Sequence, residues 1–79
     1  YADGYFYRGI AKYKMGDFPG AIDDYTQVIK INPKDSDAFF NRANVKKESG
    51  DMKGACEDWR KAADLGDDEA KKSLEEHCG

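Results

Sequence analysis

Hydrophobic residues recur along this chain at the spacing expected of amphipathic helices. Within residues 1–35 there are two such runs, Tyr5, Gly9, Ala11 and Met15, then Ala21, Ile22, Tyr25, Val28, Ile29 and Ile31. The second run follows the i, i+3, i+4, i+7 pattern of a helix that buries one face. The pattern predicts two antiparallel helices over about residues 3–15 and 18–31.

Short polar residues and proline mark the ends of these helices. Asp17 suits an N-cap, because its carboxylate can accept a hydrogen bond from a free amide of the first turn. Pro19 falls in that turn, where the missing N–H costs nothing. Asn32 and Pro33 end the second helix, because the residue before a proline is pushed out of the helical conformation.

The same succession of helix, turn and helix occurs again further along the chain. Its apolar and small positions are Ala38, Phe39, Ala43 and Val45, and then Ala55, Trp59, Ala62, Ala63 and Leu65. Gly66 stands where a left-handed C-terminal cap is expected, and Asp67 and Asp68 suit the start of another helix. A closing helix is predicted over about residues 68–77, which makes five helices and no strand.

Residues 2–35 and 36–69 are two copies of one 34-residue unit. Nine positions are identical at this offset: Asp3/Asp37, Phe6/Phe40, Arg8/Arg42, Lys12/Lys46, Gly16/Gly50, Asp17/Asp51, Gly20/Gly54, Ala21/Ala55 and Asp24/Asp58. A repeat of this length is typical of stacked architectures, in which each unit covers its neighbour. Proteins of this kind usually act by presenting a surface.

The repeated residues resemble the tetratricopeptide repeat family over residues 2–69. The matching positions are Tyr5, Gly9, Gly16-Asp17, Ala21, Tyr25, Val28 and Pro33 in the first unit, and Phe39, Ala43, Gly50-Asp51, Ala55, Trp59 and Ala62 in the second. The resemblance implies an all-α fold, a right-handed α-α superhelix of two helix-turn-helix repeats with a capping helix. It also implies a protein–protein interaction scaffold, and not an enzyme.

The small residues of the pattern allow two helices to approach closely. We expect Gly9 and Ala43 to face Ala21 and Ala55 across the two helices of each repeat, with aromatic rings filling the wider end. Residues 1–79 then form one domain: repeat 1 over 2–35, repeat 2 over 36–69 and a capping helix over 68–77.

The chain opens on residues that align with the junction between the two repeats. Tyr1-Ala2-Asp3 corresponds to Asp35-Ser36-Asp37 at the 34-residue offset. We therefore expect a fragment of a longer array, in which these repeats could serve only to terminate the stack. An uncovered apolar side on the first helix favours weak self-association.

Four basic residues depart from the family pattern, Arg8, Lys12, Arg42 and Lys46. Arg8 and Asp24 are separated by 16 residues, as are Arg42 and Asp58. We predict structural ion pairs within each repeat or between neighbours, since a partly buried arginine favours a fixed carboxylate. The alternative is a set of solvated charges worth about 0–1 kcal/mol.

The resemblance places the ligand groove on the first helix of each repeat. The implied contact positions are Asp3, Phe6, Tyr7, Ile10, Tyr13, Lys14, Phe40, Asn41, Asn44, Lys47 and Glu48, with Asp37 at the rim. Rings, amides and mixed charges suit an extended peptide. Alternatively, Phe6 and Phe40 only pack between helices. The carboxylate clamp of some family members is not expected, because only Asn41, or in another register only Asn44, matches it.

Cys56 and Cys78 fall at the same level if the last two helices fold back on each other. A disulfide would then be feasible and would contribute about 3 kcal/mol. We favour two reduced thiols, because disulfides are rare in the cytosol, and a cytoplasmic location is slightly favoured over the periplasm or the extracellular space.

Charge and composition argue against several other classes of protein. The net charge is -3 without a concentrated basic face, so nucleic acid is not an expected partner. No apolar stretch approaches the roughly 20 residues of a membrane span. His77 with two cysteines falls short of four zinc ligands, and no catalytic or cofactor motif is present. We expect no metal and no cofactor.

Overall fold

The computed structural model describes residues 2–79 and contains five α-helices in that range, with no strand. The helices are α1 (Ala2–Lys14), α2 (Phe18–Ile31), α3 (Ser36–Glu48), α4 (Met52–Asp64) and α5 (Asp68–His77). The predicted all-α fold is confirmed. The predicted ranges 3–15, 18–31 and 68–77 differ from these bounds by one residue at most.

Each helix after α1 begins at an aspartate whose carboxylate accepts a hydrogen bond from an amide of the first turn. The four N-caps are Asp17, Asp35, Asp51 and Asp67. Three turns pass through a glycine with positive φ, Gly16 at 83°, Gly50 at 94° and Gly66 at 102°. A side chain is strained in this conformation, so these glycines let one helix stop and the next begin within a few residues.

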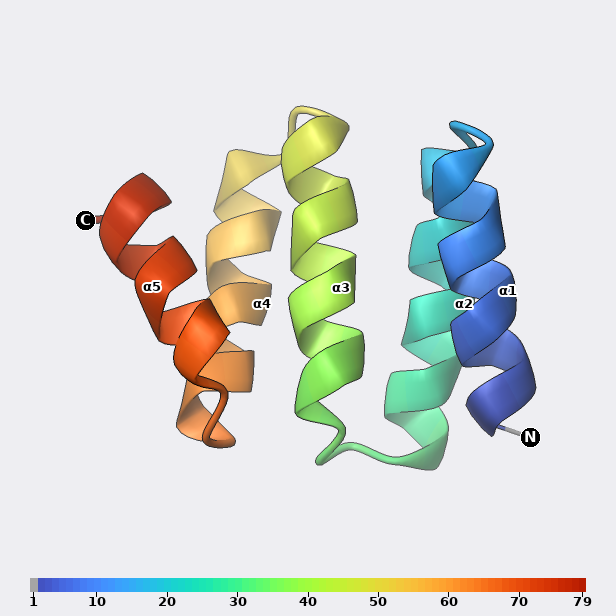
Figure 1. The fold of residues 1–79 in the computed structure, drawn as a ribbon, viewed down its shortest axis with the longest axis horizontal. Coiled ribbons are helices and arrows are strands. Elements are labelled where there is room, and N and C mark those ends of the chain that lie inside the picture. Colours follow the sequence, from blue (N-terminus) through green and yellow to red (C-terminus); the bar gives the residue numbers. More distant parts are fainter. Residues whose placement is uncertain (1) are drawn as a thin grey trace.

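The helices form two antiparallel hairpins that stand side by side, with α5 at one end (Figure 1). In each hairpin one helix packs on the next, α1 on α2 and α3 on α4. Contacts between α2 and α3 join the hairpins, and α5 packs on α4. In the view of Figure 1, α1 and α3 lie in front of α2 and α4, so the two first helices share one layer.

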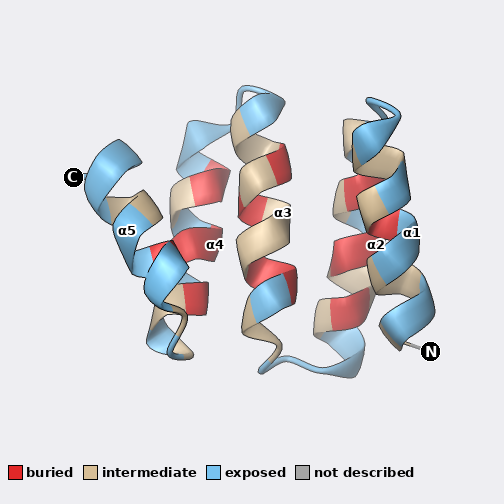
Figure 2. Cartoon of the chain, in the orientation of Figure 1, coloured by how far each residue is buried: buried red, intermediate tan, exposed pale blue. Residues whose placement is uncertain are grey.

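Most buried residues lie on α2, α3 and α4 (Figure 2). Two groups of buried side chains hold the arrangement together. The first consists of Ala21, Tyr25 and Val45, and the second of Phe39, Ala43, Ala55, Trp59, Ala62 and Ala70. Since the first group includes residues of α2 and α3, and the second includes residues of α3, α4 and α5, the core is shared between neighbouring units.

Glycine at position 9 permits a closer contact than we expected. A Cβ at Gly9 would lie 3.0 Å from Cε1 of Tyr25, and the ring of Tyr25 supplies the three nearest atoms. The nearest neighbour of Gly9 across the two helices is therefore the ring of Tyr25. A larger residue at this position of α1 would meet the Tyr25 ring.

Candidate functional site

Two cavities lie between α1 and α3, and we call the surface that contains them the channel. Toward the C-terminal ends of these helices it opens into a cavity of about 250 Å³. The lining residues are Ile10, Tyr13, Lys14, Tyr25, Asn41, Asn44 and Val45. We call this the amide cavity, because its two asparagines offer both donors and acceptors.

A second cavity of about 180 Å³ lies toward the N-terminal ends of the same helices. It is lined by Ala2, Asp3, Phe6, Tyr7, Val28, Asp35 and Asp37. We call it the acidic cavity, because three carboxylates surround two aromatic rings. Asp35 is occupied in part as the N-cap of α3, where it accepts a hydrogen bond from Ala38 N–H.

The channel brings together eight of the eleven residues assigned to the groove by resemblance. Phe6 and Tyr7 line the acidic cavity, and Ile10, Tyr13, Lys14, Asn41 and Asn44 line the amide cavity. Asp3, the eighth of these residues, and Asp37, which was placed at the rim, also line the acidic cavity. Phe40, Lys47 and Glu48 line neither of the two.

Two of these three residues are occupied by contacts within the protein. Phe40 packs against the buried group around Trp59, so the packing alternative describes it. Glu48 accepts a hydrogen bond of 3.0 Å from the Tyr13 hydroxyl, which ties the end of α3 to α1. Phe6 has both roles, because its ring contacts Tyr25 at 5.7 Å between centroids while lining the acidic cavity.

The tyrosines of the amide cavity remain protonated well above neutral pH. The hydrogen bond to Glu48 raises the pKa of Tyr13, with burial and the charge of Glu48 acting in the same direction. Burial raises the pKa of Tyr25 to about 12, since the phenolate would be poorly solvated. Both phenols therefore stay neutral at physiological pH.

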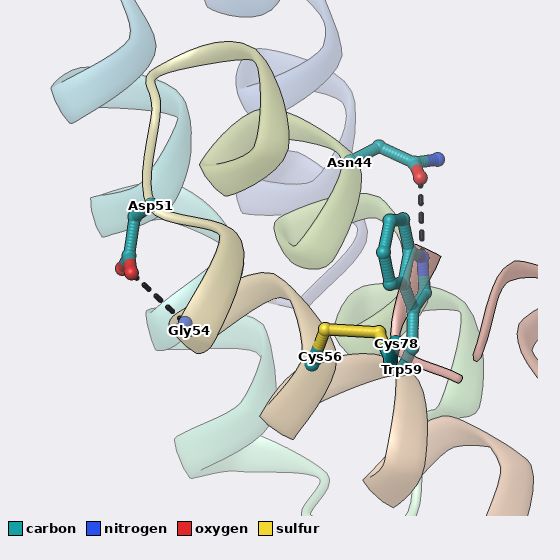
Figure 3. The surroundings of a disulfide bond; sticks show 6 residues. All are labelled: Asn44, Asp51, Gly54, Cys56, Trp59 and Cys78. Atoms are coloured by element: carbon teal, nitrogen blue, oxygen red, sulfur yellow. Dashed lines mark hydrogen bonds between the residues drawn. A yellow bond between two sulfur atoms is a disulfide. The ribbon is translucent and has the colours of Figure 1, made fainter. Parts of the chain in front are cut away.

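One contact of the amide cavity had no signal in the sequence. The indole Nε1–H of Trp59 donates a hydrogen bond of 3.2 Å to Oδ1 of Asn44 (Figure 3). This bond holds the Asn44 side chain from beneath and leaves its NH2 group free to donate to a ligand. The two residues belong to different helices, and no motif links them.

The predicted ion pairs form within each repeat. Arg8 binds Asp24 through two hydrogen bonds of 2.9 and 2.7 Å, and Arg42 binds Asp58 through two of 2.8 Å. The Arg8 hydrogen bonds lower the pKa of the Asp24 carboxyl against the opposing effect of burial. Both aspartates are buried, so each needs its arginine as a fixed partner.

The lysines of the departing pattern complete this arrangement, which we call the polar seam. Lys12 lies 3.4 Å from Asp24, and Lys46 lies 3.1 Å from Asp58. The seam therefore comprises one arginine, one lysine and one buried aspartate in each repeat. It holds each first helix to its second helix.

Cys56 and Cys78 form a disulfide between α4 and the end of α5 (Figure 3). Their Cα atoms are 6.0 Å apart, which is within the usual range. The disulfide that we considered feasible, and not the favoured pair of free thiols, is what the structure contains. Sequence spacing could not distinguish the two, because it does not report the redox state. Among residues 2–79, no group of three or more potential ligand side chains could hold a metal ion.

A model of the tetratricopeptide repeat matches residues 2–35, and a second model with the same description matches residues 24–57. The chain belongs to the tetratricopeptide repeat family. The second match begins within α2 and ends within α4, as expected of a periodic stack that can be divided at either helix of the pair. A comparison with curated proteins returned no match.

Membership of the tetratricopeptide repeat family settles the general class of the protein. These repeats generally mediate protein–protein interaction and form non-enzymatic scaffolds. None of the helices in residues 2–79 is long and apolar enough to cross a membrane.

Proposed function

We propose that the channel between α1 and α3 binds an extended segment of a partner protein. The observation that carries this proposal is that the amide and acidic cavities both lie between the same two helices, α1 and α3. Tyr7 has a relative exposure of 69%, so its ring can contact a ligand without first leaving a packed position. Aromatic rings next to amides suit a peptide, because rings contact its side chains while amides bond its backbone.

The charges at the two ends of the channel favour one chemical type of ligand. Asp3 and Asp37 are exposed beside Phe6 and Tyr7 in the acidic cavity. A lysine or arginine of the bound segment would be attracted to both the carboxylates and the ring faces. Lys14 at the amide cavity suits an acidic residue further along the same segment. We infer an extended peptide with a basic residue at one end.

Selection of displayed peptides on the oxidised protein tests the proposal, with affinities then measured by calorimetry. Asn41→Ala should weaken binding of the selected peptides about tenfold, as loss of a hydrogen bond to a ligand does. Asp37→Lys should change the preference from basic to acidic peptides. Arg60→Ala, an exposed change on α4, serves as the matched control. Equal binding by all four proteins would contradict a groove in this channel.

A second candidate is a structural role at the end of a longer array. Arg42 has a side-chain exposure of 16%, whereas Arg8 has 58%. Arg42 also donates a hydrogen bond of 3.1 Å to Thr26 of the preceding hairpin. We infer that the equivalent face of the first hairpin can receive a further helix in the same way.

Sedimentation at several concentrations addresses this second candidate. If the face around Arg8 accepts helices, the isolated chain should associate weakly, and Arg8→Glu should reduce the association. A monomer at every concentration would count against an open stacking face. Retention of a partner by the Asn41→Ala and Asp37→Lys proteins would favour the structural role over the groove. We infer no catalytic role for either candidate.

A further inference from the structure

We propose that the Cys56–Cys78 disulfide regulates the channel by controlling whether α5 covers Trp59. This inference rests on the proposed binding function, because it concerns the amide cavity of the same channel. The contact that connects the two is the hydrogen bond from Trp59 to Asn44 (Figure 3). Trp59 therefore contacts Asn44 of the amide cavity and His77 of the terminal helix.

Helix α5 is attached to α4 through different kinds of residues from those that attach α3 to α4. In α3 the residues seven and eleven positions after the N-cap Asp35 are Arg42 and Lys46, which bind Asp58. In α5 the corresponding positions after Asp67 are Leu74 and Cys78. The terminal helix therefore has an apolar contact and a covalent bond where α3 has the polar seam.

Few side chains of α5 are buried against the rest of the protein. Ala70 is the only fully buried residue of the helix, and Leu74 and Cys78 pack partly against the group around Trp59. A helix of ten residues is marginal in water without such packing. The disulfide is thus the strongest single link between α5 and α4, and its cleavage would allow α5 to separate.

The part of α5 nearest the disulfide covers Trp59. His77 stacks on the indole with 5.3 Å between ring centroids and 20° between ring planes. His77 immediately precedes Cys78, so release of Cys78 frees the stacked ring as well. Trp59 is only 1% exposed while α5 is in place. Without this cover, water reaches the indole N–H and competes for the bond that orients Asn44.

The chemical step is an exchange with a dithiol reductant. One thiolate of the reductant attacks a sulfur of the Cys56–Cys78 bond, and the other cysteine leaves as a thiolate that takes up a proton. The second thiol of the reductant then attacks the mixed disulfide and releases the remaining cysteine. The protein gains two electrons and two protons, and the reductant becomes a cyclic disulfide.

The test uses Trp59, which is the only tryptophan of the chain and gives a single indole N–H signal by NMR. Exchange of this proton with deuterium is measured for the oxidised protein and after addition of dithiothreitol. We expect reduction to accelerate the exchange about tenfold or more and to shift the side-chain amide signals of Asn44. The amides of Ala21 and Val28, in the first hairpin, should keep their exchange rates.

The variant Cys56→Ser/Cys78→Ser is the matched control. It should exchange at the rate of the reduced protein, and dithiothreitol should not change it. Equal indole exchange in both redox states would overturn the proposal, because α5 would then stay in place without the bond. Simultaneous loss of protection at Val28 and Trp59 would also overturn it, because the disulfide would then maintain the whole fold. No ligand is used, so a channel that binds no peptide would leave this result unchanged.

Discussion

The polar seam occurs twice with the same residues but in two different environments. In repeat 1, Arg8 holds Asp24 while more than half of the arginine side chain faces solvent; in repeat 2, Arg42 holds Asp58 and is largely covered. The covering helix is α2, whose Thr26 also accepts a hydrogen bond from Arg42. The contribution of an ion pair to stability thus depends more on whether a neighbouring unit covers it than on the two residues of the pair.

The largest predicted effect compares removal of the two arginines. Arg42→Met should lower the free energy of unfolding by about 3 to 4 kcal/mol, because Asp58 stays buried with only Lys46 beside it. Arg8→Met should cost clearly less, since solvent can reach the Asp24 site once Arg8 is gone. Urea unfolding followed by circular dichroism measures both. Equal losses of stability would show that the cover which α2 provides over Arg42 does not change the contribution of the ion pair.

The disulfide joins repeat 2 to α5 and does not involve repeat 1. Its removal should therefore destabilise repeat 2 and α5. Cys56→Ser/Cys78→Ser is expected to lower the stability of repeat 2 and α5 by about 3 kcal/mol under oxidising conditions, because the bond closes a loop with a sequence separation of 22. Thermal unfolding with and without dithiothreitol provides the measurement. A wild-type melting temperature unaffected by the reductant would contradict this expectation.

Alkaline pH should destabilise repeat 1 before repeat 2. Tyr25 and Trp59 occupy equivalent positions, and only the tyrosine ionises. Because the folded pKa of Tyr25 is raised to about 12 from about 10 when unfolded, its stabilising contribution is complete below pH 10 and is lost as pH rises through 12. The loss should reach about 2 kcal/mol at pH 12. Unfolding of Tyr25→Phe over this pH range should show a smaller decline than the wild type.

Substitution of the small residues at positions 9 and 43 tests how closely each hairpin is packed. Gly9→Ala improves helix propensity but places a methyl group 3.0 Å from the Tyr25 ring, so we expect a net loss of about 1 kcal/mol. Ala43→Gly should lose about 1 kcal/mol through helix propensity alone. Melting temperatures of the two variants show whether each substitution stabilises or destabilises the protein. A stabilised Gly9→Ala protein would mean that the ring can move aside.

Acidic pH should produce the smallest effect, on the exposed seam. The pKa of Asp24 is lowered in the folded state, chiefly by the Arg8 hydrogen bonds. Its contribution is therefore present above the unfolded value of about 3.9 and is lost as pH falls through the lowered folded pKa. Melting temperatures below pH 4 should fall less steeply in Arg8→Met than in the wild type. A parallel decline in the two proteins would indicate that other carboxylates govern acid unfolding.

Many residues of the candidate site could be predicted from local sequence patterns. The contacts that these residues make with other helices could not. The spacing of 16 residues between Arg8 and Asp24 predicted a pair, because two antiparallel helices bring such positions to the same level. The position of Phe40 in the groove column gave no indication that its ring would turn toward the group around Trp59. Likewise, neither Asn44 nor Trp59 alone indicates a hydrogen bond between α3 and α4.

The sequence by itself determined the five helices, their aspartate caps, the 34-residue period and the residues of the seam, because these depend on neighbours within about one helical turn or one hairpin. Only the tertiary structure decided which seam is covered, which groove residues remain available to a ligand, and that Cys56 meets Cys78. Those outcomes depend on how whole helices pack, and packing sets burial, dielectric environment and the distance between remote side chains.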